Sequence, residues 1–118
     1  IVKEFEDESE KEIEIHLLLK NEDSTVCENA ITLGASFYHH FFTSDFHPLF
    51  YFNGNLISKT KRDYHIIMRY LALIDLNEKF QESNMPSYRK DIVRIVVSDY
   101  LNNSTFDPKL LIIGPKSL

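Results

Sequence analysis

The sequence predicts an all-α fold in which four helices form a bundle. Apolar side chains recur at spacings of three and four residues over 24–43 and again over 63–83, which is the period of an amphipathic helix. Glycine is scarce, with three residues in 118, and no low-complexity run interrupts the chain. These features are typical of a folded domain rather than a disordered or fibrous chain. We therefore expect a helical bundle.

The first two helices are expected at 11–20 and 24–43, separated by the polar run Asn21-Glu22-Asp23. Two adjacent apolar stripes in the second segment predict a helix that is buried on much of its circumference. Either Asp23 or Ser24 is expected to cap it, because a short side-chain oxygen accepts hydrogen bonds from the free amides of the first turn. The apolar positions of the first segment are Ile13, Ile15, Leu17, Leu18 and Leu19.

The segment between the second and third helices contains a candidate turn. Asn53-Gly54 lies between Phe50-Tyr51-Phe52 and Leu56-Ile57. Both central residues of a tight hairpin turn favour positive φ, and Asn-Gly is a preferred pair there. A short β-hairpin over 50–57 is therefore predicted within the otherwise helical chain.

Two further helices are expected at 63–83, with Asp63 as a plausible cap, and at 87–101. Pro86 separates them, because proline in a helix interior removes a hydrogen bond. The last segment is rich in β-branched residues, so a strand competes with the helix there. The period and the length favour the helix. The apolar tail over 110–115 is predicted to be an ordered connection.

Length and composition favour a single domain over 1–118. Of the residues, 43% are hydrophobic, which is enough for a core, and the chain begins with Ile, so we expect a fragment of a longer protein. The net charge is −5, with acidic residues concentrated before Glu14, which argues against direct nucleic-acid binding. The single cysteine, Cys27, cannot form a disulfide within the chain, so we expect it to be a small buried apolar side chain. This cysteine usage favours a reducing, intracellular compartment. No apolar run is long enough to cross a membrane.

Three spaced blocks resemble the first half of a cyclin box, especially in transcriptional cyclins of the L, K and Q types. The first is Phe37-Tyr38-His39-His40-Phe41-Phe42 at the end of the second expected helix. The second is Leu76-Asn77-Glu78-Lys79-Phe80-Gln81-Glu82 at the end of the third. The third is Arg89-Lys90-Asp91-Ile92-Val93 at the start of the fourth. Their order and approximate spacing agree with the family as well.

The resemblance implies a cyclin-like regulatory subunit that binds and activates a cyclin-dependent kinase and is linked to transcription. The location implied is intracellular, nuclear or cytoplasmic, with the nucleus favoured. Such a protein is not an enzyme and needs no cofactor. Lys79 stands where cyclins carry a kinase-contacting lysine. The kinase-binding residues implied are Leu73, Leu76, Lys79, Phe80 and Glu82.

Two alternatives remain open. The runner-up is a helical scaffold with the cyclin fold that binds proteins other than a kinase, and an enzyme is a distant third. A metal site is not expected among the five histidines, because His39 and His40 point about 100° apart on a helix and no second pair at helical spacing completes a set of ligands.

Overall fold

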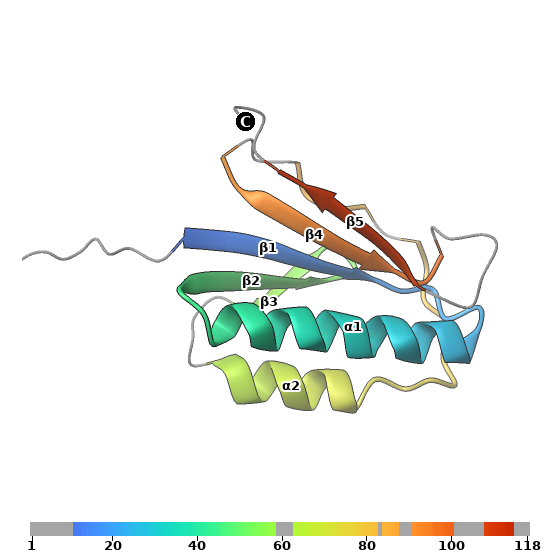
Figure 1. Ribbon diagram of the computed structural model, residues 1–118. Coiled ribbons are helices and arrows are strands. Elements are labelled where there is room, and N and C mark those ends of the chain that lie inside the picture. Colours follow the sequence, from blue (N-terminus) through green and yellow to red (C-terminus); the bar gives the residue numbers. More distant parts are fainter. Residues whose placement is uncertain (1–10, 59–62, 83, 88–90, 101–107, 115–118) are drawn as a thin grey trace, which may run out of the picture.

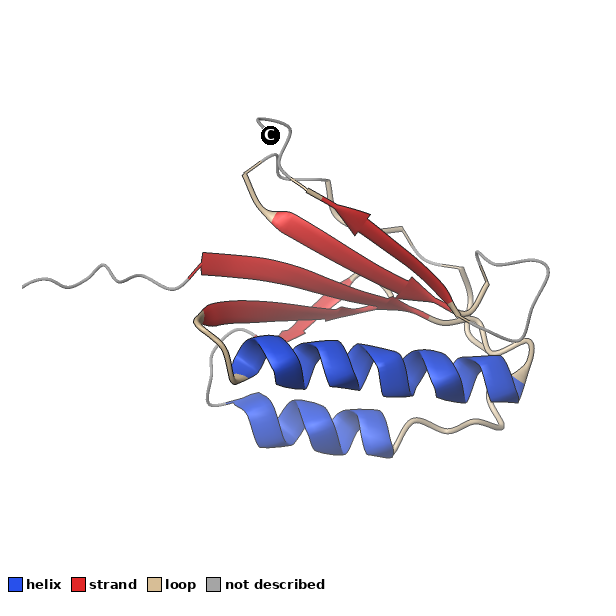
Figure 2. Cartoon of the chain, in the orientation of Figure 1, coloured by secondary structure: helices blue, strands red, loops and turns tan. Residues whose placement is uncertain are grey.

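The computed structural model describes residues 11–58, 63–82, 84–87, 91–100 and 108–114 (Figure 1). The chain forms an α/β fold with one five-stranded mixed sheet, in the order β3-β2-β1-β4-β5, and two helices (Figure 2). The predicted all-α, cyclin-like bundle is therefore wrong. The elements are β1 Lys11–Leu18, α1 Ser24–Phe42, β2 Phe46–Phe52, β3 Asn55–Ser58, α2 Tyr64–Ala72, β4 Val93–Ser98 and β5 Lys109–Ile113.

The first predicted helix is the central strand β1, which pairs in parallel with both β2 and β4. A strand in this position is covered on both faces, so its side chains are buried on both sides, including the polar ones of Glu14 and His16. From Ile13 onward every residue of β1 is buried. From Glu12 to His16 polar and apolar residues alternate strictly, as they do in a strand. The adjacent Leu17 and Leu18 break this alternation and made the spacing of the apolar residues look helical.

The second predicted helix is confirmed as α1. Asp23 is its N-cap, because the carboxylate Oδ1 accepts hydrogen bonds from the amides of Thr25 at 2.9 Å and Val26 at 3.3 Å. Cys27, in the first turn, is fully buried as expected. Both helices lie on the same face of the sheet (Figure 1). They cover the odd-numbered side chains of β1 together with residues of β2 and β4, and the main core residues are Ile13, Ile15, Leu17, Tyr38, Phe50, Ile67, Leu71, Ile95 and Val97.

The predicted hairpin is confirmed as the antiparallel pair β2 and β3. Asn53 has φ 47° and Gly54 has φ 85°, so both turn residues adopt the left-handed conformation that this kind of turn requires. The turn is also braced from inside the fold, since the Asn53 side chain accepts a hydrogen bond from the amide of Leu19 at 2.8 Å and donates one to its carbonyl.

The last two helix predictions need correction. The third helix ends early, because α2 closes at Ala72 and the described residues 73–82 form turns and coil. The fourth is the strand β4, as the β-branched side chains of Val93, Ile95, Val96 and Val97 favour. The tail forms β5, which pairs antiparallel with β4 and leaves β5 at one edge of the sheet and β3 at the other.

The described coil residues after α2, 73–82 and 84–87, lead back to the face of the sheet that carries no helix. This coil begins near the carboxyl end of β1, where the Phe80 amide donates to the Lys20 carbonyl at 2.9 Å. It passes against Gly54 of the hairpin turn, and the Ser87 carbonyl then accepts a hydrogen bond from Arg94 at 3.1 Å. This crossing closes the second face without a helix. In the described residues neither helix is long and apolar enough to span a bilayer.

Candidate functional site

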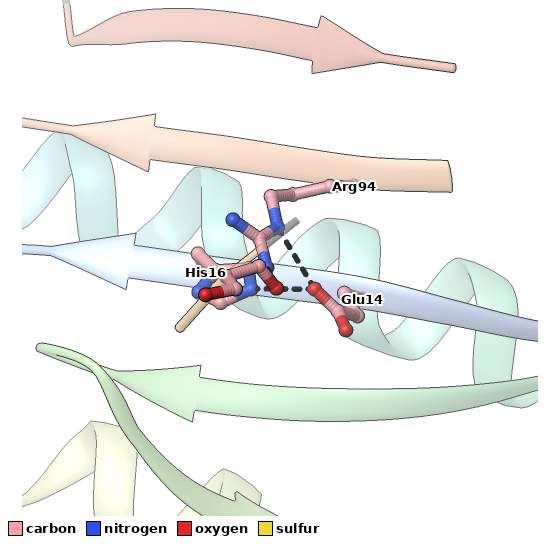
Figure 3. A network of polar contacts seen from close by, with 4 residues as sticks. Glu14, His16 and Arg94 are labelled. Carbon is pink, nitrogen blue, oxygen red and sulfur yellow. Dashed lines mark hydrogen bonds and ion pairs between the residues drawn. The ribbon is translucent and has the colours of Figure 1, made fainter. Parts of the chain in front are cut away.

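A charged cluster lies on the coil-covered face of the sheet (Figure 3). Glu14 and His16 project from β1, and Arg94 projects from β4 directly opposite Glu14 in the strand register. Arg94 Nε donates to Glu14 Oε1 at 2.8 Å, and His16 Nε2 lies 2.9 Å from the same oxygen. The alternation of strand side chains places all three on this face, because their neighbours in sequence point toward the helices.

This cluster is closed to solvent. Glu14 is 2% exposed, His16 0% and Arg94 3%, and the His16 ring stacks on Tyr51 with 4.3 Å between centroids. Burial lowers the pKa of His16 although the hydrogen bond to Glu14 opposes that shift, so the imidazole is neutral at pH 7. The buried charges are therefore the paired guanidinium and carboxylate. A substrate has no route to them while the coil is in place, and the cluster reads as a polar part of the core.

The carboxyl ends of the parallel strands are the usual place for ligands in an open α/β sheet. Here the chain itself fills that place. The Asp99 carboxylate accepts hydrogen bonds from the backbone amides of Lys20 at 2.9 Å and Asn21 at 2.8 Å. The Asn21 side chain donates to the carbonyls of Leu76 and Glu78. These hydrogen bonds join three connections of the chain to one another at this edge of the sheet.

An exposed apolar stripe runs along α2 and its C-cap. Ile66 is 63% exposed, Tyr70 is 40% and Leu73 is 69%. Spacings of four and three residues place them on one side of the helix, about a quarter turn from the buried Ile67 and Leu71. The helix is therefore apolar on two sides, and only one of them is covered by the core. We call Ile66, Tyr70 and Leu73 the α2 stripe.

The α2 stripe continues into a hollow of about 330 Å³. Its walls are formed by α2, by the end of β2 and by the coil that follows α2. The Phe52 ring meets Tyr70 and Phe80 edge to face, with 5.6 Å between centroids in each pair. Two carboxylates and no basic side chain line the hollow. Its lining residues are Phe52, Tyr70, Leu73, Ile74, Asp75, Glu78 and Phe80.

The five predicted kinase-binding residues do not share a helix face, because α2 ends at Ala72, before all of them. Leu73 and Phe80 do come together on the wall of this hollow. Leu76 turns partly inward and packs on the core. Lys79 and Glu82 are exposed on the coil. The sequence did not lead us to Ile66 and Tyr70, or to the acidic residues of the hollow, Asp75 and Glu78. The spacing of Ile66 and Tyr70 relative to Leu73 is visible in the sequence and could have indicated the stripe.

A second hollow, of about 530 Å³, lies between α1 and α2. Thr32 and Ser36 line it, and both hydroxyls donate to carbonyls of their own helix, at 3.0 and 2.9 Å. No charged group among its lining residues would select a partner: they are Ile31, Thr32, Ala35, Ser36, His39, Met68, Leu71 and Ala72. The hollow beside the α2 stripe is the better candidate because it combines aromatic and acidic groups.

Across the part of the chain that the structure describes, no three His, Cys, Asp or Glu side chains gather as they would around a metal ion. In the comparisons with known proteins, no family model, no curated protein and no solved structure matches this chain. The α2 stripe and its hollow are therefore proposed as a functional surface from their geometry alone.

Proposed function

We propose that this chain is a protein-interaction module that binds an apolar, basic segment of a partner protein along the α2 stripe and the adjoining hollow. The observation that carries the proposal is the exposure of Ile66 and Leu73, at 63% and 69%, on a helix that already buries its neighbouring side, with Ile67 and Leu71, against the core. An isolated exposed leucine needs no explanation, but a row of apolar side chains beside an aromatic hollow is typical of interaction sites.

Burial of this row supplies useful binding free energy. Fully burying an Ile or Leu side chain is worth about 1.5 to 3 kcal/mol. Because Ile66 and Leu73 are each about two-thirds exposed, covering both contributes about 2 to 4 kcal/mol. The aromatic walls around Phe52 add contact area for one further side chain. Such a site suits a helical segment with apolar residues at spacings of three and four.

The charge of the hollow selects the partner. Asp75 and Glu78 line it, both are exposed, and the chain as a whole carries a net charge of −5. A segment with Lys or Arg beside its apolar anchors therefore associates faster and more selectively than an acidic one. The attraction weakens as salt rises, because exposed charges are screened.

A peptide series tests the proposal. Helical peptides with one fixed apolar pattern and flanks of Lys, Ala or Glu are titrated against the protein by fluorescence anisotropy at low and high salt. We expect the Lys-flanked peptides to bind best. Leu73→Asp should weaken their binding by about five- to thirtyfold, since it removes one apolar anchor and places a carboxylate, which must be desolvated, where the peptide's apolar side chain packs. The matched control is Leu56→Asp on β3, where Leu56 is 38% exposed but lies outside the hollow.

Two results would overturn the proposal. One is equal binding of Lys-flanked and Glu-flanked peptides at low salt. The other is equal loss of binding in Leu73→Asp and Leu56→Asp while circular dichroism shows both variants folded. Either result would mean that the α2 stripe does not select a basic segment.

The cyclin-dependent kinase implied by the sequence resemblance, and the nuclear location that goes with it, remain proposals. Leu73 and Phe80 line the same hollow and Lys79 is exposed, which supports testing this surface for a kinase contact. Co-purification with candidate kinases, comparing wild type with Lys79→Glu, tests that partner separately. Equal binding and activation by both proteins would remove Lys79 from the contact.

A further inference from the structure

The β5 edge of the sheet presents apolar side chains on both faces. Leu110 is 41% exposed, Leu111 is 43% and Ile112 is 59%. Their pairing with β4 places Leu110 and Ile112 on the helix-bearing face, opposite Val97 and Ile95, and Leu111 on the other face. Figure 1 shows β5 away from both helices. The helix layer therefore stops short of this strand.

The opposite edge is protected against further pairing and β5 is not. β3 has four residues and its ladder with β2 shifts register between Phe50 and Tyr51, two features that blunt an edge. β5 has five residues, and Lys109 at its start is the one charged side chain in it. A regular apolar edge strand offers unpaired backbone groups to another strand.

The order of residues in β5 suits a second copy of itself. When two β5 strands pair antiparallel about a two-fold axis at Leu111, Leu110 faces Ile112 of the other copy and Leu111 faces Leu111. Lys109 faces Ile113 at each end, so no like charges meet. A two-fold axis perpendicular to the sheet also keeps both helix layers on the same face. Four apolar side chains then cluster where each protomer's helix layer stops.

We propose that two copies of this chain associate through antiparallel β5 pairing into one continuous ten-stranded sheet. Five-residue pairing buries less than the roughly 1,000 Å² of a typical stable complex, so the dimer is weak and forms at micromolar concentrations or above. Each copy carries a net charge of −5. Added salt therefore strengthens this association, whereas it weakens binding of a basic peptide to the α2 stripe.

Sedimentation velocity over about 10 to 500 µM tests the proposal in this concentration range. Wild type should shift from monomer to dimer, more strongly at high salt. Leu111→Lys should raise the dimer dissociation constant at least about tenfold, because two like charges then face each other across the axis. Leu111→Glu should do the same. An equimolar mixture of the two variants should regain the dimer, since opposite charges now pair.

The matched control is Leu56→Lys on the other edge strand, which should dimerise like wild type. A wild type that stays monomeric throughout the range would overturn the proposal. So would a dimer that survives Leu111→Lys but is lost in Leu73→Asp, because association would then run through the α2 stripe. Failure of the mixed charge pair to restore the dimer, with both variants folded by circular dichroism, would refute pairing about Leu111.

Discussion

Replacing Arg94 with Met should destabilise the protein strongly, because it leaves the Glu14 carboxylate buried without its cation. The two side chains are 3% and 2% exposed, and Arg94 Nε lies 2.8 Å from Glu14 Oε1. Methionine keeps an apolar stem of similar length but cannot donate the hydrogen bonds to Glu14 and Ser87. The carboxylate then keeps its contact with His16, which is neutral and cannot replace the lost cation.

The magnitude follows from the burial. Removing one partner of a fully buried ion pair costs about 3 to 5 kcal/mol, because the remaining charge stays desolvated. Domains of this size unfold with a free energy of about 5 to 15 kcal/mol, so Arg94→Met removes a large share of it. Replacing both partners by apolar residues, as in Glu14→Leu with Arg94→Met, should cost less than the single change, since no charge is then left buried.

Urea denaturation followed by circular dichroism measures this difference. For a denaturant dependence of about 1 to 3 kcal/mol/M, the midpoint of Arg94→Met should fall by on the order of 2 M. Arg69→Met is the control, because Arg69 is exposed on α2. A loss below about 1 kcal/mol in Arg94→Met, or a double variant less stable than the single one, would refute the role assigned to the pair.

Three further predictions concern single side chains. Burial lowers the pKa of His16 below 6.5, so the unfolded chain binds the proton more readily, and the free energy of unfolding should fall as pH drops below about 6.5, by at most about 1.4 kcal/mol per pH unit. In urea titrations from pH 7 to 5, the free energy of unfolding should change less with pH in His16→Phe than in wild type. An equal change with pH in the two proteins would contradict this prediction. Gly54→Ala should lower the free energy of unfolding by more than about 1 kcal/mol in thermal unfolding, since φ is 85° and a Cβ would meet the Asn84 carbonyl. The control, Gly34→Ala in α1, should be neutral or stabilising, because there the Cβ makes ordinary contact at 3.4 Å. A larger loss of stability in Gly34→Ala than in Gly54→Ala would be inconsistent with the turn geometry. Burial raises the pKa of the Cys27 thiol to about 12, so at pH 8 a disulfide reagent should label the native protein far more slowly than the urea-unfolded chain. Rapid labelling of the native protein would contradict this prediction and would show that the first turn of α1 opens.

The elements that sequence reasoning predicted correctly are those whose physical causes are local. In α1, a cap at Asp23 and two apolar stripes lie within one stretch of chain. In the hairpin, Asn53 and Gly54 supply the positive φ values on their own. Cys27 follows from the helix, since it belongs to one of those stripes.

The elements that were predicted wrongly depend on distant partners. β1 is a strand because β2 and β4 pair with both of its edges, and β4 is a strand because it completes that ladder. Alternation over Glu12 to His16 and the β-branched run in β4 were signals of this outcome, but each is short and competes with apparent helical spacing. The five residues predicted to bind a kinase do not share a helix face for the same reason, since α2 ends at Ala72 and, of the five, Leu73 and Phe80 line one hollow.

By itself the sequence determined a folded, acidic, apolar-rich domain with one long capped helix and one tight hairpin, because caps, turns and periodicity act over a few residues. Only the tertiary structure decided that Glu14 meets Arg94, eighty positions away in the chain. The same holds for the apolar side chains left uncovered on α2 and β5. Strand pairing joins residues that are far apart in sequence, and whether a side chain is buried depends on what the rest of the chain places over it.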